Sequence, residues 1–249
     1  MNLEFHSLLP VQREIYALPG GVDRFRRYLR TMIDAKEDDL RLPLAEMNPM
    51  GKDHVPALID AYLALGAEEL AAKTVHEMAA ETAAVPGNFK VGLVVVDDAK
   101  GGWTNRYTTE FNHCFREQAL WKRGWLVALL WTTEPPSAER ILTEVRAVAY
   151  RAAYVAQHGQ ARTLREMLAQ EGAVQAWAGG PSQSPHAAEI AFTRDLIAPL
   201  LDAADMPTIL SVLFGDPAAR ELGYTPLGLE DRAGLLLARV MAEHPSQDG

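Results

Sequence analysis

Two strongly apolar segments, 89–96 and 124–131, most constrain the fold of this chain. Both are rich in β-branched and aromatic residues, and runs of this length are typical of strands buried on both faces of a sheet. Between them lies one predicted helix, 105–118, with a loop on either side. A connection of this length favours a crossover, and therefore a parallel pair of strands.

We therefore predict an α/β fold, with α+β as the alternative. The prediction is a small, mostly parallel sheet of about three to four strands flanked by helices, followed by an all-helical C-terminal segment. Leu40, Leu42 and Leu44 alternate with polar or small residues and predict a strand over 40–46. Pro43 restricts this segment to an edge strand or a non-strand. A further short strand is expected at 173–177.

Apolar residues at helical spacing predict the remaining elements. The predicted helices are 22–33, 54–65, 67–84, 135–158, 161–170, 186–204, 207–214 and 229–242.

The stretch 179–185 is rich in Gly, Pro and Ser and is the best candidate for a linker. It divides a mixed α/β core with N-terminal helices, 1–178, from a helical tail, 186–249. We expect the tail to pack on the core as one structural unit, because 249 residues can bury roughly 70–75 % of the unfolded surface.

Charge and cysteine content limit the partners of this chain. Its formal net charge is −9, so nucleic acid, which requires clustered Lys and Arg, is not expected to bind. The single cysteine, Cys114, allows no internal disulfide, and its apolar helix face predicts a packed side chain. No secretion signal is recognised, and the longest apolar runs fall short of the ~20 residues that span a bilayer. We predict a cytoplasmic protein without a membrane partner, and a homo-oligomer through the C-terminal helices is left open.

Ligands of open parallel sheets bind beyond the carboxyl ends of the strands. If the three predicted strands are parallel, the loops 47–53, 97–104 and 132–136 meet at that edge. Asp97 and Asp98 follow their strand directly and are the candidate catalytic residues. Together with Glu134 they could hold Mg²⁺, a cation that prefers oxygen ligands.

Glycines and cations in the same loops predict an anionic substrate, because free backbone N–H groups at helix starts favour anions. The candidate substrate-binding residues are Lys52, Lys100, Gly101, Gly102, Trp103, Asn105 and Arg106.

These loop residues are a less specific signal than a complete binding motif. Gly51-Lys52 lacks the rest of a phosphate-binding loop, and Gly101-Gly102 lacks the dinucleotide pattern. Glu110 and His113 have a spacing that can place two ligands on one metal, but a second motif of this kind is missing. A strand cap at Asp97-Asp98 and a turn at Gly101-Gly102 explain these loop residues without a binding site, and a surface pair of Arg106 and Glu110 explains the helix.

Three classes of function therefore remain open. The preferred class is an enzyme that acts on a small phosphorylated or carboxylated metabolite at the strand-end loops. The alternatives are a small-molecule-binding module without chemistry, and an interaction or scaffold protein that uses a helical interface.

Overall fold

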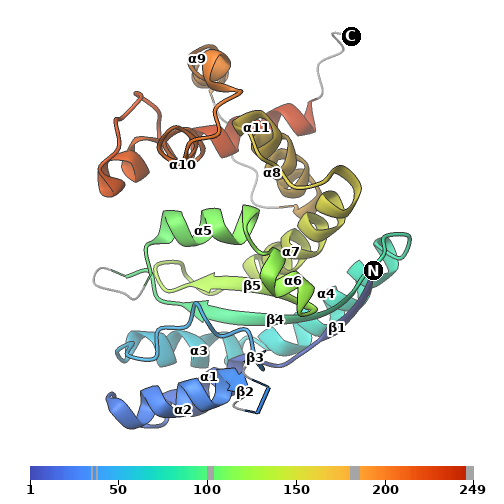
Figure 1. The fold of residues 1–249 in the computed structure, drawn as a ribbon, viewed down its shortest axis with the longest axis vertical. Helices are drawn as coiled ribbons and strands as arrows, with labels where there is room; N and C mark the ends of the chain where they lie inside the picture. The colour runs from blue at the N-terminus through green and yellow to red at the C-terminus, as the bar shows by residue number, and fades with distance from the viewer. Residues whose placement is uncertain (35, 38, 100–103, 180–185, 245–249) are drawn as a thin grey trace. The chain divides into compact units, whose positions relative to one another are not determined.

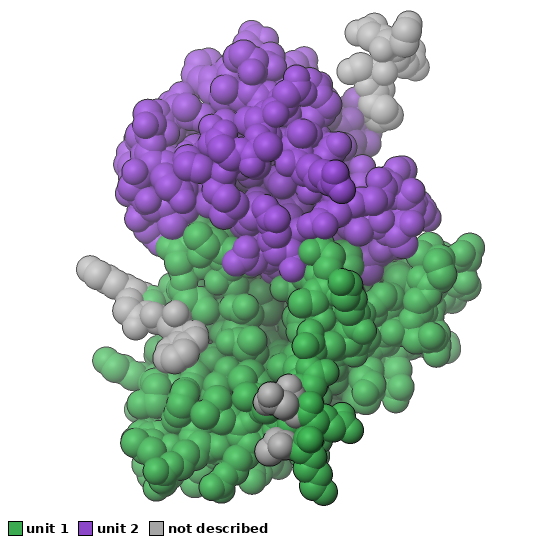
Figure 2. Space-filling model, viewed as in Figure 1, with its two compact units in different colours: residues 1–109, 117–149 green, residues 110–116, 150–249 purple. Residues whose placement is uncertain are grey.

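The computed structural model describes residues 1–34, 36–37, 39–99, 104–179 and 186–244 (Figure 1). The chain forms two compact units, drawn in green and purple in Figure 2. Unit 1 contains Met1–Thr109 and Glu117–Ala149, and unit 2 contains Glu110–Arg116 and Tyr150–Gly249. Among the described residues, no helix combines the length and the apolar character needed to cross a membrane.

A three-stranded parallel sheet forms the centre of unit 1 (Figure 1). Strand β4 (Asn88–Val96) lies in the middle, between β1 (Asn2–Phe5) and β5 (Trp125–Trp131). Both neighbours run parallel to β4. The two apolar segments are thus a parallel pair, and the predicted α/β fold is confirmed.

Helices cover this sheet. Helices α1, α3 and α4 contact β4, and α4 also contacts β1; in Figure 1 the three helices lie on one side of the sheet. The helices of unit 1 are α1 (Leu9–Tyr16), α2 (Val22–Met32), α3 (His54–Ala64), α4 (Ala67–Glu81), α6 (Gln118–Lys122) and the first half of α7 (Ala138–His158).

The predicted sheet strand at 40–46 is wrong. Only Asp39–Leu40 is extended there, as β3, and it pairs antiparallel with β2 (Ile33–Asp34) in a separate two-stranded sheet. Pro43 cannot donate a ladder hydrogen bond, and the buried Leu44 packs within a loop rather than on a sheet. The alternating leucines therefore reflect the packing of a loop and not a strand of the sheet.

The third strand of the sheet is instead β1, at the N-terminus. Its burial alternates along the strand, but it is only four residues long, so its sequence carries little strand signal. It pairs with β4 from Asn2 opposite Asn88 to Phe5 opposite Val91.

Beyond Phe5, a side chain takes the place of the strand. Gln12 of α1 is fully buried, and its amide bonds the backbone of Val95. Its Nε2 donates to the Val95 carbonyl over 3.1 Å, and its Oε1 accepts the Val95 N–H over 2.9 Å. Both backbone groups on this stretch of β4 are thus satisfied without a neighbouring strand.

We predict that Gln12→Leu destabilises the protein by about 2–6 kcal/mol, because two buried backbone groups each lose a partner at about 1–3 kcal/mol. Urea unfolding followed by circular dichroism measures the change. Glu14→Leu, on the exposed face of the same helix, is the matched control. Equal losses in both variants would contradict this role for Gln12.

Unit 2 is helical in its described residues. It contains most of α5 (Arg106–Phe115), the second half of α7, α8 (Leu164–Ala178), α9 (Ala187–Ile197), the 3-10 helix η1 (Ala198–Leu200), α10 (Met206–Leu222) and α11 (Ala233–Glu243).

The strand predicted at 173–177 is wrong, because these residues lie inside α8. A capping box of Thr163 and Glu166 begins this helix. Within it, Gly172 allows α11 to approach closely, since a Cβ there would lie 2.4 Å from the carbonyl oxygen of Ala238.

A buried polar cluster lies among these helices. Arg151 and Glu171 form a buried ion pair with two hydrogen bonds of 2.8 Å. The Nε2 atom of His113 is buried and has no hydrogen-bond partner among the described residues. Burial, with a smaller effect of the nearby Arg151 charge, lowers the pKa of His113 to about 3. As predicted, Cys114 is buried.

We predict that His113 makes stability fall as the pH decreases below about 6.5, the pKa of histidine in an unfolded chain. Between that pH and the folded pKa of His113, the unfolded chain binds one proton more, so acid favours unfolding. The free energy of unfolding should fall by up to about 1.4 kcal/mol per pH unit from this residue.

His113→Gln should remove that contribution from urea unfolding curves recorded from about pH 6 to about pH 4. His76→Gln, at an exposed site, is the control and should keep the wild-type slope. An unchanged slope in His113→Gln would show that this histidine titrates normally.

Candidate functional site

The carboxyl ends of β4 and β5 bring their following residues together. Val96 lies opposite Trp131, and the Thr132 N–H donates to the Val96 carbonyl over 3.0 Å. Asp97 and Asp98 therefore emerge beside Thr132. We call these residues, together with the side chains that contact them, the edge site.

Asp97 is the buried centre of the edge site, with 2 % of its surface exposed. Its two carboxylate oxygens accept hydrogen bonds from three side chains and one backbone N–H. The donors are Asn48 Nδ2 at 2.7 Å, His54 Nε2 at 2.8 Å, Thr132 Oγ1 at 3.2 Å and Ala99 N at 3.4 Å.

His54 begins helix α3 and reaches Asp97 with one ring nitrogen while its side chain remains 42 % exposed. A carboxylate only accepts hydrogen bonds, so the His54 nitrogen that faces it carries a proton. In the neutral ring this proton is on Nε2, which leaves Nδ1 as the acceptor. Nδ1 of His54 can therefore take up a proton.

Hydrogen bonds position Asn48 of the loop 47–53 against Asp97. The Oδ1 atom of Asn48 accepts the Met50 N–H over 2.9 Å, which leaves the amide nitrogen of Asn48 to face Asp97. The hydroxyl of Tyr16 donates to the Asn48 carbonyl. Burial, and secondarily the charge of Asp97, raises the pKa of Tyr16, so this hydroxyl keeps its proton.

Asp98 faces a different set of donors. Its carboxylate accepts hydrogen bonds from the Arg106 guanidinium at 2.9 Å, the Thr133 hydroxyl at 2.6 Å and the Thr133 N–H at 3.0 Å. Burial alone would raise its pKa, but the hydrogen bonds from Thr133 and Arg106 outweigh burial and hold the pKa of Asp98 below its ordinary value. Asp98 is therefore ionised at neutral pH.

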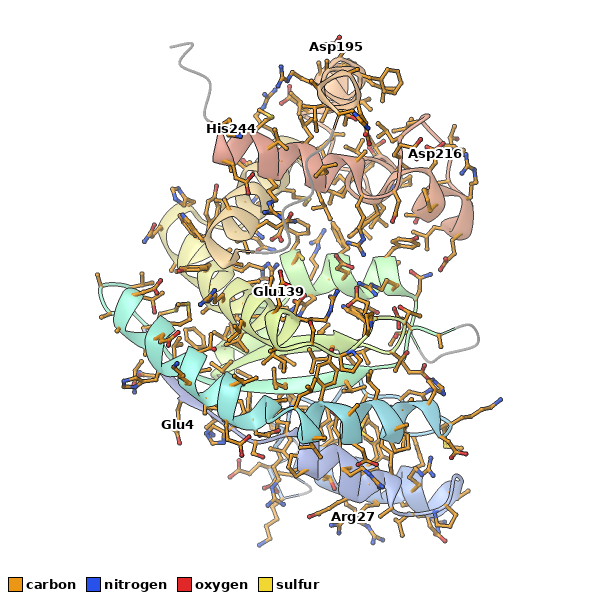
Figure 3. All side chains as sticks on the ribbon, turned by 180° about the vertical axis from the view of Figure 1, so that it is seen from behind. Glu4, Arg27, Glu139, Asp195, Asp216 and His244 are labelled. Atoms are coloured by element: carbon orange, nitrogen blue, oxygen red, sulfur yellow. The ribbon has the colours of Figure 1, made fainter. Side chains whose placement is uncertain are left out.

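Arg106 bridges the two strand ends. It donates to Glu134 over 2.6 Å as well as to Asp98, and its guanidinium lies 4.4 Å from the centre of the Trp131 ring. Glu134 also pairs with Arg140 of α7. Arg140 is the residue after Glu139, which is labelled in Figure 3. Two of the carboxylates predicted to hold Mg²⁺ thus bind guanidinium groups here.

No group of three or more His, Cys, Asp or Glu in the described part of the chain is arranged to hold a metal ion. The Mg²⁺ site at Asp97, Asp98 and Glu134 stays a prediction.

The structure brings four of the predicted site residues together: Asp97, Asp98, Arg106 and Glu134. Asn105 precedes α5, and its Oδ1 accepts the Thr108 N–H over 3.0 Å, as a helix cap does. Lys52 is exposed, two residues before His54. The predicted residues Lys100, Gly101, Gly102 and Trp103 lie outside the described residues.

Sequence reasoning missed Asn48 and His54, although it placed the loop 47–53 at this edge. It reached that placement through the strand at 40–46, which does not exist in the sheet. The loop 47–53 lies at this edge of the sheet because α3, the helix that follows it, packs on β4. The signal available for His54 was a histidine at the first position of a helix that directly follows the turn-rich loop 47–53.

Comparison with known protein families, curated proteins and solved structures finds no match for this chain. The functional interpretation therefore depends on the geometry of the edge site.

We predict that Asp97→Asn changes the proton position on His54. An amide can turn its NH₂ group toward Nε2, which permits the opposite tautomer, with the proton on Nδ1. The ring ¹⁵N signals of the neutral imidazole should report Nε2–H in the wild type and a larger Nδ1–H share in Asp97→Asn.

Asp53→Asn, next to His54 in the chain and exposed, is the control and should leave the tautomer unchanged. A wild-type spectrum dominated by the Nδ1–H tautomer would refute the pairing.

Proposed function

We propose that the edge site is the active site of an enzyme in which His54 exchanges a proton with a small anionic substrate. The observation that carries the proposal is the pairing of the exposed His54 ring with the buried Asp97 carboxylate at 2.8 Å. Histidine is the side chain that most often serves as a general acid or base.

Asp97 supports this role in two ways. It binds Nε2 of His54, which leaves Nδ1 as the ring nitrogen that can accept a proton, and its charge stabilises the imidazolium that then forms. Asn48 holds the second oxygen of Asp97, so the carboxylate cannot rotate away from the ring. A site built in this way supplies proton transfer of the kind worth about 10²–10⁴-fold in rate.

The preference for an anion rests on the charges near His54. Lys52 is exposed and lies two residues away, and His54 itself occupies the first turn of α3, where backbone N–H groups favour negative charge. The acidic groups Asp98 and Glu134 are paired with Arg106 and Arg140. We base the preference for a phosphorylated or carboxylated metabolite on Lys52 and the helix start, against the exposed carboxylate of Asp53 between Lys52 and His54.

The test combines binding with proton exchange. Purified protein is screened by thermal shift against inorganic phosphate, glycerol 3-phosphate, succinate and related metabolites, since a ligand at 100 times its Kd adds roughly 2.7 kcal/mol of stability. Compounds that bind are then incubated with the protein in D₂O, and NMR follows their conversion or deuterium uptake.

We predict that His54→Gln retains the thermal shift but loses about 100-fold or more of the exchange rate. His76→Gln, at an exposed site on α4, is the matched control and should keep both. Binding without any exchange in the wild type would replace the enzyme with a non-catalytic binding module. No thermal shift with any compound would refute the anionic substrate.

A further inference from the structure

The Thr132 hydroxyl lies between the two halves of the edge site. It is 3.2 Å from Oδ1 of Asp97, which binds His54, and 3.0 Å from Oδ1 of Asp98, which belongs to the carboxylate that binds Arg106. The hydroxyl oxygen also accepts the Asp98 N–H over 3.2 Å. Thr132 is therefore held in place by hydrogen bonds to the end of the neighbouring strand β4 and the two residues after it.

A threonine hydroxyl has a single proton to donate. Two carboxylate oxygens lie within hydrogen-bond distance of that proton, so Asp97 and Asp98 compete for it. The oxygen that loses the competition must rely on its other donors. For Asp98 these are Thr133 and Arg106, whereas Oδ1 of Asp97 relies mainly on His54.

We propose that Thr132 is a positioning residue that couples the Arg106–Asp98 ion pair to the His54–Asp97 pair. Its role rests on the proposed function, because His54 is the group whose chemistry it adjusts. A donor lost from Asp98 draws the Thr132 proton toward Asp98. Oδ1 of Asp97 then accepts a stronger hydrogen bond from His54.

Two substitutions should therefore act on His54 in opposite directions. Arg106→Gln removes a charged donor from Asp98 and makes it the stronger acceptor, so the His54–Asp97 hydrogen bond strengthens. Asp98→Asn weakens the competing acceptor, so the Thr132 proton turns to Asp97 and the His54 bond weakens. Neither Arg106 nor Asp98 is among the groups that bond His54 in the structure.

The experiment is a double-mutant cycle read by the ¹⁵N chemical shift of His54 Nε2, detected through the protons on the ring carbons. In the wild-type background, Arg106→Gln should move the signal downfield and Asp98→Asn should move it upfield. In the Thr132→Val background, which keeps the shape of the side chain without the hydroxyl, both displacements should vanish. Thr132→Ser should restore them.

Thr104→Val is the matched control, since the Thr104 hydroxyl bonds the backbone carbonyl of Asp97 rather than its carboxylate. Both displacements should persist in this background. If they persist in Thr132→Val as well, the charges act on His54 through space and the proposal is overturned. Displacements of the same sign for Arg106→Gln and Asp98→Asn also overturn it.

The measurement uses the free protein, so its failure differs from failure of the proposed function. Loss of exchange in His54→Gln without coupling through Thr132 leaves the enzyme proposal standing. If the coupling through Thr132 is observed but no metabolite binds, the role of Thr132 stands and the proposed enzyme function fails.

Discussion

The buried carboxylate of Asp97 is the group on which the edge site depends. A charge removed from water is costly unless donors surround it, because desolvation is offset only by hydrogen bonds of good geometry. The chain supplies these donors from three places: the loop before α3 gives Asn48, the first turn of α3 gives His54, and the end of β5 gives Thr132. The positions of that loop and of α3 therefore follow from the need to satisfy Asp97 as well as from apolar packing.

Much of the sheet could be predicted from the sequence. The segments 89–96 and 124–131 are apolar on both faces, which is a local property, and their separation implied a parallel crossover. Asp97, Asp98 and Glu134 followed from that pairing, because residues after parallel strands share an edge. The strand β1 could not be read in the same way. Its four residues are stabilised by pairing with β4 and by α4, which are distant in sequence.

The same limit explains the errors at 40–46 and the omission of His54. Alternating leucines signal burial of every second residue, and a loop packed against the unit, as at Leu44, produces that pattern without a ladder. His54 and Asp97 are separated by 43 residues, and Arg232 and Glu110 of unit 2, which form a bidentate ion pair, by 122. Pairings over such distances follow from how elements pack, which no short window of sequence contains.

The amide of Gln12 has a consequence for association between chains. An uncovered stretch of strand is a template on which a foreign peptide can add by main-chain pairing. At Val95 that template is occupied by a side chain anchored in α1, so an incoming segment would first have to displace a buried amide from both of its hydrogen bonds. The side chain of Gln12 thus prevents a strand from another chain from pairing with β4 at Val95.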